Sequence, residues 1–492
     1  MPYFFCTLFP RFRVYFSILF QYYDYLKPFL KGTLRMSVNE RRDLFETMPV
    51  PRAVATMSIP AVITSLITVV YNLADTYFVS MLNDPIQNAA VTLAFPLLLA
   101  FNAVNNLFGV GSSSMMSRAL GQQDFDTVHK SSAFGFYCSL ICGILFSLLY
   151  GVFSSPILSL LGADQVTRSQ TGQYLFWTVT LGAAPSILNV VMGYMVRAEG
   201  AALHAGIGTI SGCILNIILD PFFILPWGLN MGAAGAGLAT FVSNVFACLY
   251  FLVLLYVKRK STHVCIKPSF FKLNRKVVKG VCGVGIPASI QNLLNVTGTL
   301  VLNNFAAGYG AAVVAAIGIA GKITSVPFYT VLGVSQGIMP LISYNYASGN
   351  AKRMKSVFLF TTAVTITTMT VLSSVLFIFS RPLVGWFMAD ADVITHGSIY
   401  LRILSVAYLL LSIDFMAVGV FQACGMGKKA LLFAILRKVV LEIPLLFLLN
   451  RLIPVYGIAC AQPIAEFVLS IAAALTLVRI FSQADRRQQQ IS

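Results

Sequence analysis

The sequence predicts an all-α membrane protein of twelve transmembrane helices, arranged as two six-helix bundles related by a pseudo-two-fold axis. Three observations predict this fold. Of the 492 residues, 57% are hydrophobic and only 10% are charged, with a mean hydropathy of +0.80, whereas soluble domains carry about a quarter charged residues. Basic clusters alternate along the chain with gaps that lack them. Motifs of the first half recur in the second.

The apolar runs have the length of membrane-spanning helices. Runs such as 133–156 and 241–257 can cross, or nearly cross, roughly 30 Å of hydrocarbon as a helix. Strands of a membrane β-barrel would be short and would alternate polar and apolar residues. The runs between polar segments predict helices at 53–81, 88–118, 130–152, 170–196, 201–225, 233–257, 278–306, 312–346, 355–380, 397–424, 429–450 and 456–482.

The basic residues follow the positive-inside pattern. Gaps such as 83–87 and 225–231 contain no Lys or Arg, and they alternate with gaps that carry clusters. This places both termini and the central basic loop of a multi-pass membrane protein in the cytoplasm. The net charge of +17 therefore reports topology and contact with anionic lipid, and it argues against nucleic-acid binding. The clusters are Arg41, Arg42 and Arg52, the stretch from Lys258 to Lys279, Lys352, Arg353 and Lys355, Lys428 and Lys429, and Arg486 and Arg487.

The longest polar connection divides the chain into two lobes. We expect an N-lobe of six helices at 51–257, a cytoplasmic basic linker at 258–277, a C-lobe of six helices at 278–482 and a cytoplasmic tail at 483–492. Residues 1–50 are expected to form an N-terminal cytoplasmic extension. Its first 35 or so residues are aromatic-rich but interrupted by charges. They are either an interfacial amphipathic segment or a poorly ordered or non-native stretch ahead of a natural start at Met36, and we favour the second interpretation.

An internal repeat relates the two lobes. Ser58 to Ala61 (SIPA) matches Gly285 to Ala288 (GIPA) at an offset of 227 residues. Two further motif pairs recur in the same order at offsets of 228 and 225. Six helices per unit keep the repeats in the same orientation, so the axis should run along the membrane normal, with a cleft between the bundles near the bilayer midplane. The further pairs are Gly109 and Gly121 with Gly337 and Gly349, and Arg197 to Gly200 with Gln422 to Gly425.

Acidic residues inside the predicted helices are candidates for function. Each costs at least about 2.5–3.5 kcal/mol to insert into the bilayer centre. Asp75 and Asp220 lie toward the outer ends of helices 1 and 5, so they can share a depth. Tyr71 and Asn72 share a helix face with Asp75, and Asn216 lies one turn before Asp220. These oxygens could bind a small cation such as Na⁺, or the two carboxylates could share a proton. The alternative is that each acid makes only local hydrogen bonds.

The C-half has less interpretable acids. Glu442 follows Arg437 and Lys438 by about one turn, and Glu466 lies in helix 12. We favour a structural ion pair or polar network, with a second cation or substrate contact as the alternative. Asp414 in helix 10 is a weaker candidate. None of the nine cysteines has the spacing of a metal or redox motif, and the four histidines do not cluster.

Taken together, these motifs resemble the multidrug and toxic compound extrusion (MATE) family of bacterial efflux transporters. The resemblance implies a V-shaped pair of lobes and an antiporter that exports drug-like organic compounds, often cationic, in exchange for H⁺ or Na⁺, without a cofactor and without enzymatic activity. The branch it most resembles implies a cation site at Asp75, Asn216, Asp220 and Thr240, with Na⁺ a candidate ion at the first three. The stretches that carry it are Ser58 to Pro60, Asn72 to Ser80, Leu215 to Pro221, Gly232 to Thr240, Gly285 to Pro287 and Gly333 to Gly349.

Further expectations concern the substrate cavity and the partners. We expect Tyr71, Asn72, Gln291 and Glu442 to face small organic substrates, with membrane lipid around a monomer. Two departures from the family pattern stand out. The connection from Asp220 to Thr240 is slightly longer, and 287–302 in helix 7 lacks the acids of another branch. Coupling is therefore expected in the N-lobe.

Two other functions fit the sequence less well. A flippase for a lipid-linked saccharide, from the same superfamily, would need a larger and more cationic cleft than Lys322, Arg437 and Lys438 provide. A membrane-bound transferase would need a polar catalytic loop with His or paired acids. The loops between the predicted helices are short and lack such residues, so both alternatives are disfavoured.

Overall fold

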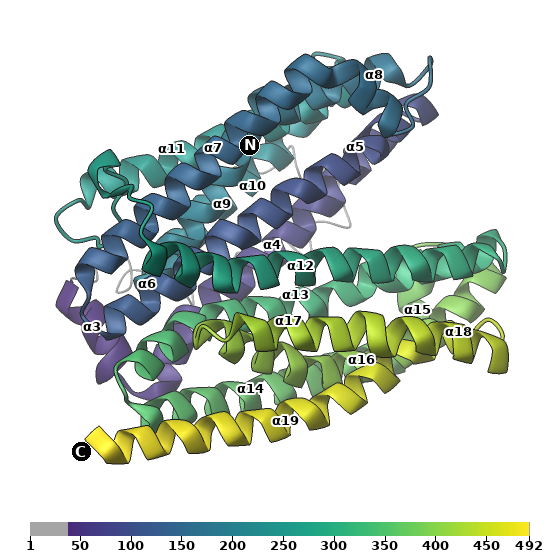
Figure 1. The fold of residues 1–492 in the computed structure, drawn as a ribbon. Helices are drawn as coiled ribbons and strands as arrows, with labels where there is room; N and C mark the ends of the chain where they lie inside the picture. The colour runs from purple at the N-terminus through teal and green to yellow at the C-terminus, as the bar shows by residue number, and fades with distance from the viewer. Residues whose placement is uncertain (1–37, 492) are drawn as a thin grey trace, which may run out of the picture.

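The structure, a computed structural model, describes residues 38–491, and the expectations for residues 1–35 lie outside this range. The described residues form helices and connecting loops, with no strand among them (Figure 1). The N-lobe contains α4 (Val50–Ser80), α5 (Pro85–Val104), η1 (Asn105–Val110), α6 (Gly111–Gly121), α7 (Phe125–Leu160), α8 (Arg168–Leu175), η2 (Phe176–Leu181), α9 (Ala183–Ala198), α10 (Ala202–Ile224) and α11 (Ala233–Val257).

The C-lobe repeats this organisation. It follows a short 3₁₀ turn, η3 (Pro268–Phe270), in the basic linker. Its helices are α12 (Arg275–Ala307), α13 (Ala311–Ala347), α14 (Ala351–Ile378), α15 (Ser380–Gly385), α16 (Ala391–Ala423), α17 (Gly427–Ile435), η4 (Leu436–Glu442), α18 (Ile443–Leu452) and α19 (Gly457–Ile491).

The helices have the dimensions of membrane spans. Within the described part of the chain, ten helices are long and apolar enough to cross a bilayer. An eleventh span comprises two helical segments, Arg168–Leu181 and Ala183–Ala198, which are bent by 51° relative to each other. The remaining predicted helix, the eleventh (429–450), corresponds to α17, η4 and α18. Its central turn is π-helical and carries charged residues, a feature often found at functional sites. The prediction of an all-α, twelve-helix protein is confirmed.

The two lobes form a V. The N-lobe, purple to teal in Figure 1, and the C-lobe, green to yellow, lie against each other near α3 and the C-terminus and diverge toward α8 and α18. We call the first end inner and the second outer. Between the lobes α4 packs on α13, and η1 and α6 pack on α12. The first helix thus meets the eighth and the second meets the seventh, as a pseudo-two-fold axis between repeats requires.

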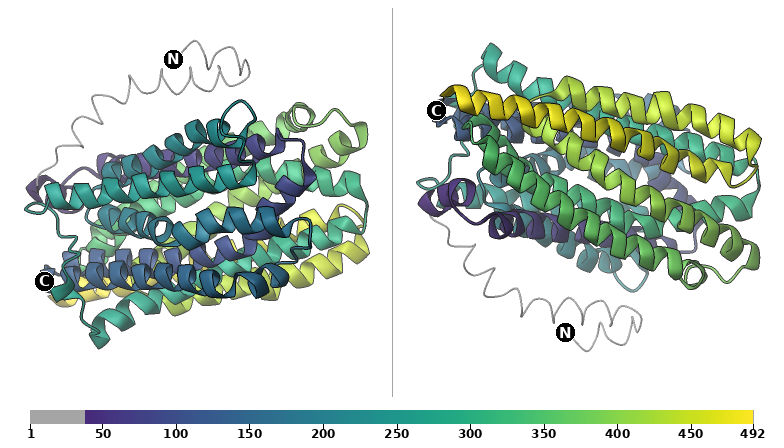
Figure 2. Two further views of the ribbon diagram at one scale, coloured as in Figure 1. Left: turned by 90° about the horizontal axis from the view of Figure 1, so that it is seen from above. Right: turned by 90° about the horizontal axis from the view of Figure 1, so that it is seen from below.

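Glycines allow the lobes to approach closely. A Cβ atom on Gly285 of α12 would lie 1.9 Å from the Leu107 carbonyl oxygen of η1, and one on Gly337 of α13 would lie 2.7 Å from the Ser58 Cα of α4. Small residues permit such backbone contact between membrane helices. Both contacts belong to the inner halves of their helices, where the ribbons converge (Figures 1 and 2).

Both ends of the described chain are helical. A nine-residue helix, α3 (Val38–Glu46), lies within the predicted N-terminal extension. It is too short and too polar to appear as an apolar run. At the other end α19 continues to Ile491, through most of the predicted tail. Both segments lie at the inner end of the molecule (Figure 2).

Candidate functional site

The predicted polar residues of the N-lobe meet between α4, α10 and α11. Asp220 is fully buried and Asn216 is 1% exposed; they lie one helical turn apart on α10. With the Asn216 amide oriented to satisfy both neighbours, it donates to Asp220 Oδ2 at 2.9 Å and accepts from the Thr240 backbone N–H at 3.1 Å. The Thr240 hydroxyl lies 3.4 Å from the same amide. The structure therefore brings Thr240 beside Asn216 despite the longer connection.

Asp75 completes this cluster from α4. Asp75 interacts electrostatically with Asp220, and both Tyr71 and Tyr174 interact with Asp75. One carboxylate oxygen of Asp75, Oδ1, is buried without a hydrogen-bond partner. Buried polar atoms are normally paired because an unpaired one is costly. This unpaired oxygen, within electrostatic range of a second carboxylate, can therefore accept a proton or a cation.

The other predicted cavity residues occupy different environments. Asn72 of α4 is exposed, whereas Asp75 and Tyr71 on the same helix are half-buried. Gln291 is 9% exposed and accepts a hydrogen bond from Gln422 Nε2 at 3.2 Å. Among the hydrogen bonds of the described residues, none joins an N-lobe residue to the side chain of Asn72 or of Gln291. Their role toward a substrate stays a prediction.

A second buried polar cluster lies in the C-lobe around Arg437 of η4. The Arg437 guanidinium donates to Asp414 Oδ2 at 3.2 Å and to Asn295 Oδ1, and it lies 3.9 Å from Glu466 Oε1. One oxygen of Asp414 and one of Glu466 are buried without partners. Three helices, α12, α16 and α19, supply these partners, so the cluster depends on tertiary packing.

The neighbouring residues of η4 form a pair of their own. Lys438 Nζ lies 2.6 Å from both oxygens of Glu442, which is 6% exposed. This is the network that the sequence favoured for Glu442, although Arg437 pairs elsewhere. The two groups together comprise three carboxylates and two cations in a buried environment. Ionised in full, they carry one net negative charge, so this region can also bind one proton or one monovalent cation.

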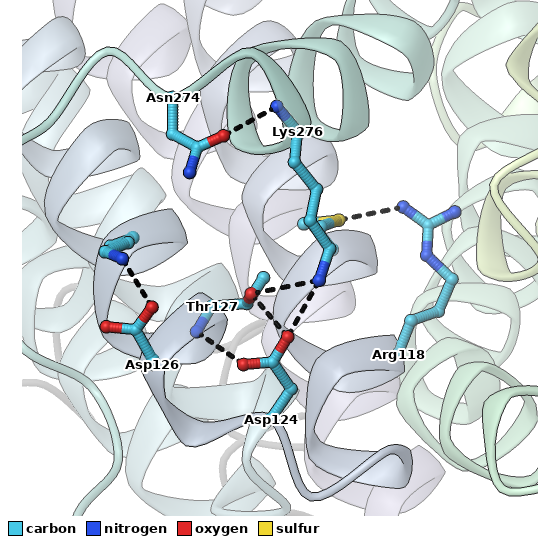
Figure 3. A network of polar contacts seen from close by, with 8 residues as sticks. Arg118, Asp124, Asp126, Thr127, Asn274 and Lys276 are labelled. Atoms are coloured by element: carbon cyan, nitrogen blue, oxygen red, sulfur yellow. Dashed lines mark hydrogen bonds and ion pairs between the residues drawn. The ribbon is translucent and has the colours of Figure 1, made fainter.

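The inner loops carry an exposed polar network between the lobes (Figure 3). Lys276 Nζ of α12 donates to Asp124 Oδ2 at 2.8 Å, and Thr127 Oγ1 donates to the same oxygen at 2.6 Å. The hydrogen bond from Lys276, followed by those from Thr127, lowers the pKa of Asp124 to about 2. Asp124 also caps α7, and Asn274 caps α12. The charges fix these helix ends relative to each other.

Comparison with known proteins supports the family resemblance. The MatE family model matches this chain twice, at residues 60–222 and 287–448. The chain belongs to the MATE family. The two matches begin 227 residues apart, which is the offset of the repeat in the sequence.

MATE relatives cover nearly the whole chain. Multidrug export protein MepA of Staphylococcus saprophyticus is 34% identical over 438 residues, covering 89% of this chain and 95% of the relative. MepA of Staphylococcus aureus is 33% identical over 437 residues, with the same coverage. The members of this family are described as export proteins and transporters. The chain is therefore a transporter and not an enzyme.

Solved MATE structures share the architecture. A crystal structure of MATE in complex with MaL6 matches with a TM-score of 0.85 at 26% identity, over 90% of this chain and 99% of that chain. A structure described as the outward-facing conformation of a multidrug resistance MATE family transporter of the MOP superfamily matches with a TM-score of 0.83 at 25% identity, over 92% and 98%. The V-shaped fold of this chain is therefore a MATE fold.

Sequence reasoning missed two residues of these clusters. Tyr174 of α8 is 4% exposed and interacts with Asp75 and Asp220. Asn295 of α12 accepts from Arg437. Neither lies near an acid in the sequence. The only signal available was a polar side chain inside an apolar run, which many structural residues share.

Proposed function

We propose that this MATE transporter exports drug-like organic compounds, often cationic, in exchange for H⁺ or Na⁺. The support for the cargo is the name of the MepA relatives, multidrug export protein. The support for the coupling site is the orphaned Asp75 Oδ1 beside Asp220. The relatives do not favour the alternative of a lipid-linked saccharide flippase.

The N-lobe cluster fits the chemistry of the coupling ion. Asp75, Asp220, Asn216 and Thr240 offer carboxylate, amide and hydroxyl oxygens, the donors that hard cations such as Na⁺ prefer. The same pair of carboxylates can instead hold a proton, because two buried like charges disfavour full ionisation. No resident cofactor is needed in either case. In the branch this chain most resembles, these residues form the cation site, and we assign them that role.

Loading of the cluster would be transmitted by α4. Neutralising Asp75 and Asp220 removes the repulsion between α4 and α10 and lets the two helices pack differently. We propose that this shift of α4 releases the substrate toward the outside. The return step requires the lobes to separate at the inner end, where Gly337 now touches Ser58. This is alternating access between two lobes.

The orientation follows from the charges. The basic linker, the start of α14 with Arg353, and both described chain ends lie at the inner end (Figures 1 and 2). By the positive-inside rule this end faces the cytoplasm. We therefore propose a multi-pass protein of the bacterial inner membrane, open to the outside in this structure, that works as a monomer.

Transport by purified protein in liposomes tests the proposal. A pH gradient and a Na⁺ gradient are imposed separately, and efflux of a fluorescent organic cation is followed. We expect one gradient to drive transport, and Asp75→Asn or Asp220→Asn to abolish it while the protein still inserts. Asp392→Asn, which changes an exposed carboxylate at the start of α16, is the matched control and should transport normally. Gradient-driven transport by both N-lobe variants at the wild-type rate would refute the assignment.

A further inference from the structure

The short helix α3 contacts both lobes at the inner end. It precedes α4 directly, and the Thr47 and Met48 N–H groups donate to the Asp43 carbonyl at 2.9 and 2.7 Å, closing the turn between the two helices. Leu44 is fully buried and Phe45 is 3% exposed. An amphipathic helix lying in the lipid interface would turn such residues outward. Here they face protein, so α3 has a binding partner within the molecule.

Arg41 anchors α3 to the N-lobe. Its Nη1 atom lies 2.7 Å from Glu199 Oε1, and the two side chains are only 8% and 3% exposed. Glu199 follows α9, and its second oxygen accepts from Thr262 Oγ1 at 2.9 Å and from the His263 N–H at 2.8 Å. Both oxygens of the Glu199 carboxylate therefore have hydrogen-bond partners. These bonds offset the cost of burying the ion pair.

Arg353 of α14 holds α3 from the C-lobe. Its guanidinium donates to the backbone carbonyls of Phe45 at 2.6 Å, of Met48 at 2.7 Å and of Leu44 at 3.2 Å. The last carbonyls of a helix lack partners within the helix and carry the negative end of its dipole. Asn345 Nδ2 donates to the Phe45 carbonyl as well, at 3.2 Å. The C-lobe thus caps a helix that belongs, by its covalent connection, to the N-lobe.

Tyr344 of α13 adds a side-chain contact on the same side. Its ring stacks on Phe45 with centroids 4.7 Å apart and planes 13° apart. Its hydroxyl donates to Glu46 Oε1 at 2.5 Å. On the opposite side lies Gly200, in a left-handed conformation with φ of +91°. A Cβ atom there would lie only 3.1 Å from the Phe45 ring and 3.2 Å from Leu44, so both side chains pack closely against this glycine. The apolar side chains of α3 therefore lie between the turn after α9 in the N-lobe and α13 in the C-lobe.

From these contacts we infer that α3 is a strap that keeps the inner ends of the two lobes closed. The strap moves with the N-lobe, because it continues into α4 and its Arg41–Glu199 pair is deeply buried. Its contacts with Arg353, Asn345 and Tyr344 are the ones that break when the inner end opens. Outward opening leaves them intact. The strap therefore biases the transporter toward the state in this structure and sets how often the inner end opens.

The inference rests on the alternating movement proposed above, so the experiment measures that movement directly. Spin labels are placed at Lys260→Cys on the linker and Ser348→Cys after α13, both exposed, in a background without the nine native cysteines. Electron–electron double resonance then gives the distribution of distances across the inner end in liposomes. A longer distance reports inner opening. The wild type is measured with and without an organic cation and at two pH values.

Arg353→Ala is the principal variant. It removes three hydrogen bonds from a charged donor, so the population with the longer distance should rise about tenfold or more. Lys352→Ala is the matched control, because it removes an exposed cation from the same helical turn without a contact to α3. Its distribution should equal that of the wild type. Tyr344→Phe removes only the bond to Glu46 and should produce a smaller rise.

The outcomes separate the two proposals. A wild type that never shows the longer distance, under any condition, contradicts alternating access itself. A wild type that shows it, with Arg353→Ala and Tyr344→Phe indistinguishable from Lys352→Ala, overturns the strap. A rise in the order Lys352→Ala, Tyr344→Phe, Arg353→Ala supports the strap. Should Arg353→Ala fail to fold, Tyr344→Phe against Lys352→Ala decides the question alone.

Discussion

The glycine contact between the lobes makes a quantitative prediction about Gly285→Ala. The new Cβ would lie 1.9 Å from the Leu107 carbonyl oxygen, whereas real Cβ contacts essentially never fall below 3.0 Å. The helices α12 and η1 must therefore move apart by at least about 1 Å, because the carbonyl oxygen is backbone and the position of a Cβ is set by its own backbone. Overpacking of this kind costs about 1–3 kcal/mol. Alanine regains about 0.5–1 kcal/mol through its higher helix propensity.

The expected net effect is a loss of up to about 2.5 kcal/mol of stability in this closed inner end. Gly283→Ala, two residues earlier on the same helix, is the matched control because its Cβ would meet nothing within 4 Å. It should be neutral or stabilising by up to about 1 kcal/mol. Thermal unfolding in detergent, followed by circular dichroism, should place Gly285→Ala below the wild type and Gly283→Ala at or above it. Equal melting of the two variants would refute close backbone contact between the lobes.

Two further predictions concern charged groups. Lys276→Ala should raise the pKa of Asp124 from about 2 toward its ordinary 3.8, because the strongest donor to the carboxylate is lost; isotope-edited infrared titration, assigned with Asp124→Asn, measures it. The Lys276–Asp124 pair stabilises the fold by at most about 1 kcal/mol, because it is exposed to solvent. This contribution is complete above the pKa of Asp124 in the unfolded chain and is lost as the pH falls through about 2, the pKa in the folded protein. Arg437→Met should lower the free energy of unfolding by about 3–5 kcal/mol, because Asp414 and Glu466 would stay buried without their cation. Adding Asp414→Asn and Glu466→Gln to it should recover folding yield and melting temperature.

Each of these predictions has a contradicting result. An Asp124 pKa that stays near 2 in Lys276→Ala would show that Thr127 alone depresses it. A stable Arg437→Met protein would show that the two carboxyl groups are already neutral in the wild type. The triple variant then distinguishes charge from packing, because failure to recover points to the lost contact with the Phe415 ring, 4.9 Å from the guanidinium.

The N-lobe cluster was predictable because its polar residues follow a helical spacing within short stretches of sequence. Asn216 and Asp220 are one turn apart in an otherwise apolar helix, and helical periodicity alone puts them on one face. The matched outer-end positions of Asp75 and Asp220 follow from span lengths and the direction of each helix. The sequence did not predict which residues of other helices pack against this cluster. Tyr174 reaches the cluster because α8 and α11 pack together, which no local pattern encodes.

The C-lobe cluster and the strap show the same limit. Arg437 is five residues from Glu442, yet it pairs with Asp414 and Glu466 on other helices. The π-helical turn changes the angular spacing along η4, so expectations based on an ordinary helix fail there. Helix α3 is short and polar, and its stabilising partner Arg353 lies more than 300 residues away.

The sequence by itself determined the apolar spans and the duplication, and it predicts the orientation. These properties depend on the length of apolar runs, on the alternation of charge and on recurring motifs, all of which are readable along one dimension. Only the tertiary structure decided which buried charges are paired, which oxygen of Asp75 is left without a partner and where the two lobes touch. A buried charge or a glycine acts through the atoms within about 3–4 Å of it, and helix rotation and packing alone select those atoms.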